Sequence, residues 1–273
     1  MPACIPLQAG FFVSMSPLIF LNFGYLSNIN VIARLLMDCA TPEAAPLITT
    51  TLVRLNLPLR IEEVRFLRGI FLRSSNRDGR CDTLLHNHEG DSLRYSYPLV
   101  QYKCMGGNGA VLVLSHGGAD VPDLVVPPDG EVNVGRRRAM MTLAGVYRAE
   151  TAVGIVPTPV RYRIEDYLPF NQENYERYEA LDGLVARLSL IEECLTGNVL
   201  SLCKGLGVWL DGRVACSVTD CRPLRAVVFK GVPMMRFRVE ASINVALPPL
   251  AGLGKGVSHG FGSAVAINGD CFR

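Results

Sequence analysis

The chain has 273 residues, of which 49% are hydrophobic, and a formal net charge of +2. The hydrophobic fraction excludes a protein that is disordered over most of its length, and the length allows one large domain or two of ordinary size. Because the net charge is so small, attraction to nucleic acid must come from local clusters of basic residues.

The first 33 residues carry no charged side chain, which raises the question of a signal or a membrane span. Pro6, Pro17 and Gly24 interrupt the apolar run, and no basic segment precedes it as a signal peptide would require. We therefore expect residues 1–47 to be an extension ahead of the folded domains, with no membrane contact.

The nine cysteines contain no CxxC pair and no Cys/His cluster with the spacing of a zinc site. An odd number of cysteines without a secretory signal indicates reduced thiols in a cytoplasmic protein. Most of them are expected to be small core residues.

The first predicted domain spans residues 48–148. Residues 48–59 are rich in β-branched side chains that alternate with polar ones, which predicts a strand. Residues 61–74 have apolar side chains at helical spacing, and residues 92–103 and 110–115 form two more strands joined by a glycine turn. This order predicts the first half of a β-α-β-β-α-β ferredoxin-like unit.

The second half of this unit is less clearly marked. The segment 117–130 contains three prolines, so its helix would be short. The sequence EVNVGRRR, residues 131–138, is predicted to be the last strand of the unit.

The second predicted domain spans residues 152–273 and begins with a strand at 160–169. A long helical segment follows, with Asn171 as its cap. Its apolar stripe consists of residues three or four apart: Leu181, Leu184, Leu188, Ile191, Leu195, Val199 and Leu202. Gly183 and Gly197 weaken this helix, and Gly197 is the candidate for splitting off a second one.

Strands dominate the remainder of the chain. Their predicted ranges are 213–220, 225–231, 235–247 and 263–267. The fold class is therefore α+β, with two tandem ferredoxin-like units whose sheets border a basic cleft. Two basic clusters could line that cleft or could simply be solvated: Arg136–Arg138, and five basic residues without an acid between Arg222 and Arg238.

A glycine-rich segment, GLGKGVSHGFGSAV, runs from Gly252 to Val265. Its glycines expose backbone N–H groups that suit phosphate. It is no Walker P-loop, because Gly256 follows Lys255 where Ser or Thr is required. It also opens no helix, which excludes a dinucleotide site. With both nucleotide sites excluded, the expected ligand of this segment is the phosphate of a nucleic-acid backbone.

Three segments resemble one family in order and at plausible spacing. They are DTLLHNHEGDSLRYSYPLVQYK, then YRIEDYLPFNQENYERYEAL with GNVLSLCKGLG, and the loop GLGKGVSHGFG after INVALP. The family is that of the CRISPR-associated endoribonucleases that process precursor CRISPR RNA, in the repeat-associated superfamily of tandem ferredoxin-like domains. The resemblance runs from about Thr49 to Ile267. It implies CRISPR repeat RNA as the partner, a CRISPR effector complex as a further candidate partner, and no cofactor.

The chemistry that this resemblance implies needs no metal, because the RNA 2′-OH attacks the adjacent phosphorus. A base, an acid and a cation must then surround that phosphate. His88 is our first candidate for the acid or base and His86 the second, since family members often place a histidine in that neighbourhood. Without the resemblance, the sequence LHNH could equally be a capped turn. Lys103 could stabilise the phosphorane or be an exposed strand end.

The remaining candidates concern RNA binding. The predicted RNA-binding residues are Gly252, Gly254, Lys255, Gly256, Ser258, His259, Gly260, Gly262, Arg236 and Arg238. His259 could instead be a surface loop residue, and His116 is expected to lie in a turn. Tyr95, Tyr97 and Tyr102 could stack on bases or pack in the core.

Two functions follow from these observations. The first is a metal-independent endoribonuclease that leaves 2′,3′-cyclic phosphate and 5′-hydroxyl ends. The second is a non-catalytic RNA-binding subunit of an effector complex. The pair of histidines in LHNH favours the first, and the sequence indicates no particular oligomeric state.

Overall fold

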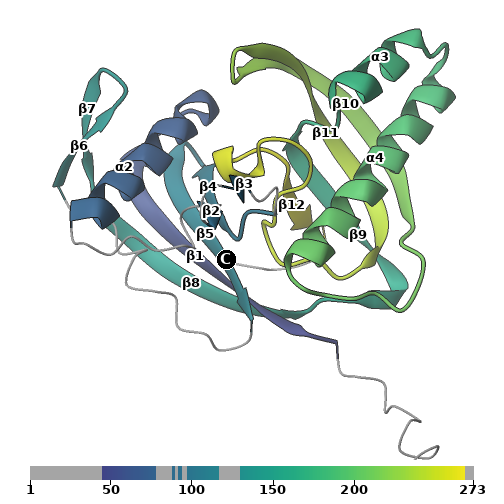
Figure 1. Ribbon diagram of the computed structural model, residues 1–273, viewed down its shortest axis with the longest axis horizontal. Coiled ribbons are helices and arrows are strands. Elements are labelled where there is room, and N and C mark those ends of the chain that lie inside the picture. The colour runs from purple at the N-terminus through teal and green to yellow at the C-terminus, as the bar shows by residue number, and fades with distance from the viewer. Residues whose placement is uncertain (1–44, 78–87, 90–91, 94–96, 117–129, 268–273) are drawn as a thin grey trace, which may run out of the picture. The chain divides into compact units, whose positions relative to one another are not determined.

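Two four-stranded antiparallel sheets organise the chain (Figure 1). The computed structural model describes residues 45–77, 88–89, 92–93, 97–116 and 130–267. Both sheets belong to the unit that begins at Ala45.

The first sheet has the strand order β4-β5-β1-β8, which is the order of a ferredoxin-like domain. The elements of this domain are β1 (Leu47–Pro58), η1 (Ile61–Glu63), α2 (Val64–Arg77), β2 (His88–Glu89), β3 (Ser92–Leu93), β4 (Val100–Met105), β5 (Asn108–His116), β6 (Gly130–Val134), β7 (Arg137–Met141) and β8 (Leu143–Ala152). The predicted first strand, first helix and hairpin are confirmed. The turn between β4 and β5 consists of Gly106 and Gly107, with φ angles of 56° and 78° that favour glycine.

The prediction for residues 131–138 is wrong. These residues do not form the fourth strand but a separate two-stranded hairpin, β6–β7, in which Val134 pairs with Arg137. Gly135 has a φ of 65°, which reverses the chain before a longer strand can form. The fourth strand is β8, which pairs with β1 along its length. The short helix predicted in the segment 117–130 lies in residues 117–129, outside the described part of the chain.

The second sheet has the order β10-β11-β9-β12 and repeats the same topology. Its domain consists of β9 (Ile155–Tyr167), α3 (Gln172–Ala180), α4 (Leu184–Gly205), β10 (Cys216–Phe229), β11 (Val232–Val245), η3 (Val257–His259) and β12 (Ser263–Ala266). In place of a second long helix, the glycine-rich segment and η3 connect β11 to β12. The predicted tandem ferredoxin-like fold is confirmed.

The helical segment confirms one local prediction and corrects another. The side chain of Asn171 accepts a hydrogen bond from the N–H of Asn174 at 2.7 Å, as expected of a helix cap. The helix divides at Gly183, where φ is 86°, and not at Gly197, which lies inside α4. The two strands predicted at 213–220 and 225–231 are one strand, β10, with irregular pairing at two points.

The two domains share a hydrophobic core. One face of the first sheet packs against α2 through residues such as Val53 and Leu67. The opposite face, which includes Leu112, belongs to the same buried cluster as Ile164 and Leu195 of the second domain. The surface where the two domains meet is therefore fixed by packing, and the glycine-rich segment lies at that junction (Figure 1).

Candidate nucleic-acid interface

The glycine-rich loop, residues 252–262, is closed at its base and packed against protein. Gly252 and Ser263 pair as an antiparallel bridge. A Cβ added at Gly254 would lie 2.6 Å from the carbonyl oxygen of Leu168, and one added at Gly262 would collide with the carbonyl oxygen of Leu253. Both glycines have positive φ angles, 88° and 70°. The high glycine content is thus explained first by backbone packed against backbone.

Side chains from the first domain hold one end of the loop at Gly252. Its N–H donates to Gln101 Oε1 at 3.0 Å, and its carbonyl oxygen accepts from the hydroxyl of Tyr97 at 2.8 Å. Gln101 Nε2 closes the ring by donating to the oxygen of Tyr97 at 2.8 Å. Gln101 is completely buried, and burial raises the pKa of Tyr97, so that its hydroxyl stays protonated. Both backbone groups of Gly252 are therefore fixed by the other domain.

Lys103 holds the other end of the loop. Its side chain points to the same face of β4 as Gln101, and its Nζ donates to Ser263 Oγ at 2.9 Å. Lys103 lies within β4 and is 1% exposed, and burial lowers its pKa to about 7. The sequence left Lys103 as either a stabiliser of the phosphorane or an exposed strand end. The structure places its Nζ in the buried interface between the domains.

The predicted RNA-binding residues of the loop fall into two groups. Gly252, Gly260 and Gly262 are buried, so they serve packing. Lys255 is exposed. The partly exposed residues around it are Gly254, Gly256, Ser258 and His259.

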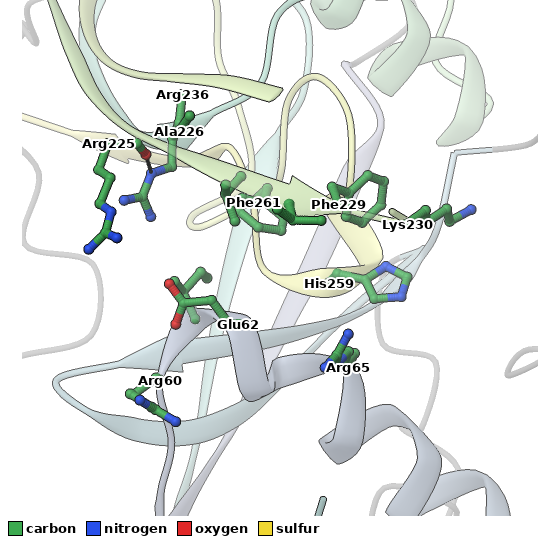
Figure 2. A pocket seen from close by; sticks show the side chains of 13 residues that line it. Arg60, Glu62, Arg65, Arg225, Ala226, Phe229, Lys230, Arg236, His259 and Phe261 are labelled. Carbon is green, nitrogen blue, oxygen red and sulfur yellow. Dashed lines mark hydrogen bonds between the residues drawn. The ribbon is translucent and has the colours of Figure 1, made fainter. Parts of the chain in front are cut away.

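A pocket of about 760 Å³ lies beside the loop, between the two domains (Figure 2). Its wall from the first domain is formed by η1 and the start of α2, and its other wall by β10, β11 and the loop. The lining residues are Arg60, Ile61, Glu62, Arg65, Arg225, Ala226, Val227, Val228, Phe229, Lys230, Arg236, His259 and Phe261. Five of these carry a positive charge and one a negative charge, so the predicted basic cleft has a counterpart here.

The basic residues of the second domain differ in how free they are. Arg236 forms an ion pair with Asp166 at 3.1 Å, and Arg238 pairs with Glu165 at 2.8 Å. Burial raises the pKa of Asp166 although Arg236 opposes this effect. Arg225 and Lys230 are exposed and form no ion pair with the described residues. These two are therefore the cations of the second domain that are free to meet a phosphate in the pocket.

His259 lines the pocket as a neutral imidazole. Burial, followed by the charges of Arg68 and Lys230, lowers its pKa to about 4. Its Nδ1 lies 3.1 Å from Ser258 Oγ, and its ring meets Phe229 edge-on, with centroids 5.4 Å apart. His259 is therefore a hydrogen-bonding group at neutral pH and adds no charge to the pocket.

Of the two candidate catalytic histidines, only His88 lies in the described part of the chain, and it is located through its backbone alone. His88 pairs with Leu93 in the short hairpin β2–β3, while His86 lies outside the described residues. Paired residues have Cα atoms about 5.5 Å apart, and the four steps from Leu93 to Tyr97 span at most about 14 Å. The backbone of His88 thus lies within about 20 Å of Tyr97, which holds the glycine-rich loop.

The other predicted residues have structural positions. Tyr102 is buried and packs against Phe71, with centroids 5.8 Å apart, while Tyr95 lies outside the described residues. His116 is exposed at the end of β5 and does not lie in a turn. The sequence did not point to Arg60, Arg65 or Gln101, because only the tertiary fold brings them to the loop.

Three further features concern metal ligands, cysteines and membrane spans. Among the described residues, no group of three His, Cys, Asp or Glu side chains could hold a metal ion. The five cysteines in this part of the chain are free thiols, and none of its helices is long and apolar enough to cross a membrane.

Comparison with protein families shows to which family the chain belongs. The Cas6b N-terminal domain matches residues 47–151, and the Cas6b C-terminal domain matches residues 154–267. The chain belongs to the Cas6b family. The boundary between the two matches falls between β8 and β9, where one ferredoxin-like unit ends and the next begins.

Solved structures show the same fold. A crystal structure of Cas6b superposes with a TM-score of 0.70 at 23% identity and covers 81% of this chain and 100% of that chain. A crystal structure of the CRISPR RNA processing endoribonuclease Cas6b superposes with a TM-score of 0.59 at 21% identity, covering 81% and 99%. A curated relative from Methanocaldococcus jannaschii, the uncharacterized protein MJ0978, is 29% identical over 115 residues, which are 42% of this chain and 77% of that protein.

Proposed function

We propose that this Cas6b protein is a metal-independent endoribonuclease that cuts precursor CRISPR RNA within its repeats. Membership of the Cas6b family carries the proposal, because a structurally similar member is described as a CRISPR RNA processing endoribonuclease. The basic pocket beside the glycine-rich loop supports RNA as the substrate. The reduced thiols agree with a cytoplasmic site of action.

The proposed reaction uses the substrate's own nucleophile. The 2′-oxygen forms a bond to the adjacent phosphorus while its proton passes to a general base. The bond from phosphorus to the 5′-oxygen breaks, and a general acid protonates that oxygen. The products are a 2′,3′-cyclic phosphate and a 5′-hydroxyl end. No metal is required to generate the nucleophile.

His88 is the proposed base or acid, and His86 is the second choice. An unperturbed imidazole has a pKa of about 6.5 and can take either role near neutral pH. The buried ammonium of Lys103 is bonded to Ser263, so we assign phosphate contacts to exposed cations such as Lys255, Arg225 and Lys230. Lys103 then acts by holding the loop that carries Lys255.

Cleavage of a repeat-containing transcript in excess EDTA tests this proposal. The account expects cutting at one position in each repeat, with cyclic phosphate and hydroxyl ends identified by mass spectrometry. A 2′-deoxy nucleotide at the cut position should abolish cutting and leave binding intact. Binding without cutting of the all-RNA transcript would assign the protein to the non-catalytic RNA-binding class.

A further inference from the structure

The two ends of the interdomain pocket differ in chemistry (Figure 2). The arginine end contains Arg60, Arg225 and Arg236, and a guanidinium group suits phosphate oxygens. Arg225 is exposed and forms no ion pair with the described residues, whereas Arg60 pairs with Glu63 and Arg236 with Asp166. The aromatic end contains Phe229, Phe261 and His259, with Lys230 beside Phe229 and Arg65 near His259. Aromatic faces stack on bases and do not recognise phosphate, so the rings suit a different part of a ligand from the charged groups around them.

The aromatic end is built as a fixed surface. Phe229 meets His259 and Phe261 edge-on, with centroids 5.4 Å and 5.8 Å apart. Phe261 is buried beneath, whereas Phe229 and His259 remain partly exposed to the pocket. Lys230 Nζ lies over the Phe229 ring, 5.7 Å from the centroid, so a base that stacks here would also meet a positive charge.

His259 adds one directional hydrogen bond to this surface. Its Nδ1 lies beside Ser258 Oγ, and among the described residues its Nε2 has no hydrogen-bond partner. Since the imidazole is neutral, it can match the edge of a base and offers a phosphate no charge. Arg65 lies across the pocket from His259 in Figure 2, and its guanidinium sits over the Phe66 ring, 4.8 Å from the centroid.

We infer that the aromatic end of this pocket binds one unstacked nucleobase of single-stranded RNA, while the neighbouring phosphates lie along the arginine end. Sequence-reading RNA sites commonly combine an aromatic face, a guanidinium plane and a hydrogen bond to a base edge. Phe229, Arg65 and His259 supply these three elements from two domains. The inference rests on the proposed function only for RNA as the ligand and does not depend on cleavage.

Binding of a repeat RNA made uncleavable by one 2′-deoxy nucleotide tests the inference. A set of such RNAs carries a single abasic site at each position in turn, and their affinities are measured by fluorescence anisotropy. For the wild-type protein, one abasic position should lower the affinity about 5- to 150-fold, the range expected for loss of one stacked base. That penalty should vanish in Phe229→Leu and in His259→Leu, because these variants have already lost the contact.

Matched variants separate recognition from folding. Val232 pairs with Phe229 across the β10–β11 hairpin but does not line the pocket, so Val232→Ala should retain the full abasic penalty. His259→Gln keeps a hydrogen-bonding group and should retain part of it. Thermal denaturation identifies any variant that fails to fold. If Phe229→Leu does not fold, the test rests on His259→Leu and His259→Gln.

Two results would overturn the inference. One is an abasic penalty that is equal in the wild-type protein and in Phe229→Leu and His259→Leu. The other is a loss of affinity in both variants that is the same for every RNA. Such a uniform loss would mean that the aromatic end contacts the RNA backbone and not a base. Protein that shows the predicted pattern yet never cuts the unmodified RNA would contradict the proposed endoribonuclease and leave this inference standing.

Discussion

The ammonium of Lys103 donates a hydrogen bond to the hydroxyl of Ser263 at 2.9 Å, across the junction of the two domains. Ser263 pairs with Gly252, whose N–H is bound by Gln101, two residues before Lys103 on β4. One strand of the first domain therefore fixes both ends of the glycine-rich loop of the second. We expect RNA binding by the loop and the relative position of the domains to depend on each other.

The burial of Lys103 predicts a rise in stability with pH. The folded-state pKa of about 7 lies below the ordinary value of 10.5, because burial disfavours the charged form. Between pH 7 and pH 9 the unfolded chain binds a proton at this residue that the folded chain releases, so the free energy of unfolding should increase. The contribution is at most about 1.4 kcal/mol per pH unit. Urea unfolding should show a smaller slope with pH for Lys103→Met than for the wild type. Equal slopes for the two proteins would contradict a Lys103 pKa that is lowered by burial.

Loss of Gln101 should loosen the loop. Gln101→Leu leaves the N–H of Gly252 buried without its partner, which costs about 1–3 kcal/mol. Hydrogen exchange should become faster at the Gly252 amide, and the melting temperature should fall. Gln172→Leu is the matched control, because Gln172 is exposed and its side chain donates to Glu176 on the surface of α3. If both variants unfold and exchange as the wild type does, the ring of hydrogen bonds around Gly252 is not a structural support.

Lys255 should contribute one phosphate contact. Lys255→Ala is expected to weaken RNA binding for all sequences and to reduce the slope of log affinity against log salt by about 0.7–0.9. Arg148→Ala on the exposed surface of β8 serves as the control for a lost positive charge. Titrations at several salt concentrations check both quantities. An unchanged slope for Lys255→Ala would remove the exposed part of the loop from the RNA interface.

Residues 1–44 should be dispensable for RNA binding and cutting. The first 33 of them carry no charged side chain, and the Cas6b matches begin at residue 47. A chain that starts at Ala45 retains all of β1 and should match the full-length protein in RNA affinity and cleavage rate. A truncated protein that folds normally but no longer binds RNA would place the extension in the site.

Local sequence patterns predicted the elements that depend on near neighbours. The strand at 48–59, the helix at 61–74 and the Asn171 cap follow from side chains a few residues apart. The packing of the loop could not be predicted in this way, because Gly252 binds Gln101, 151 residues earlier in the chain. The same limit applies to the pocket, where Arg60 and Arg236 face the same cavity from different domains. The hairpin at residues 130–141 was missed because one glycine, Gly135, decides between one strand and two.

The single-turnover cleavage rate of His88→Ala, measured alongside its RNA affinity, tests the central claim most directly. If His88 is the general acid or base, the rate should fall about 10²- to 10⁴-fold while the affinity stays within about twofold of the wild type. The affinity survives because phosphate contacts elsewhere supply most of it. A normal rate for His88→Ala with a crippled His86→Ala would move the role to His86 and keep the mechanism. Wild-type cleavage rates in both variants would contradict the assignment of catalysis to these histidines.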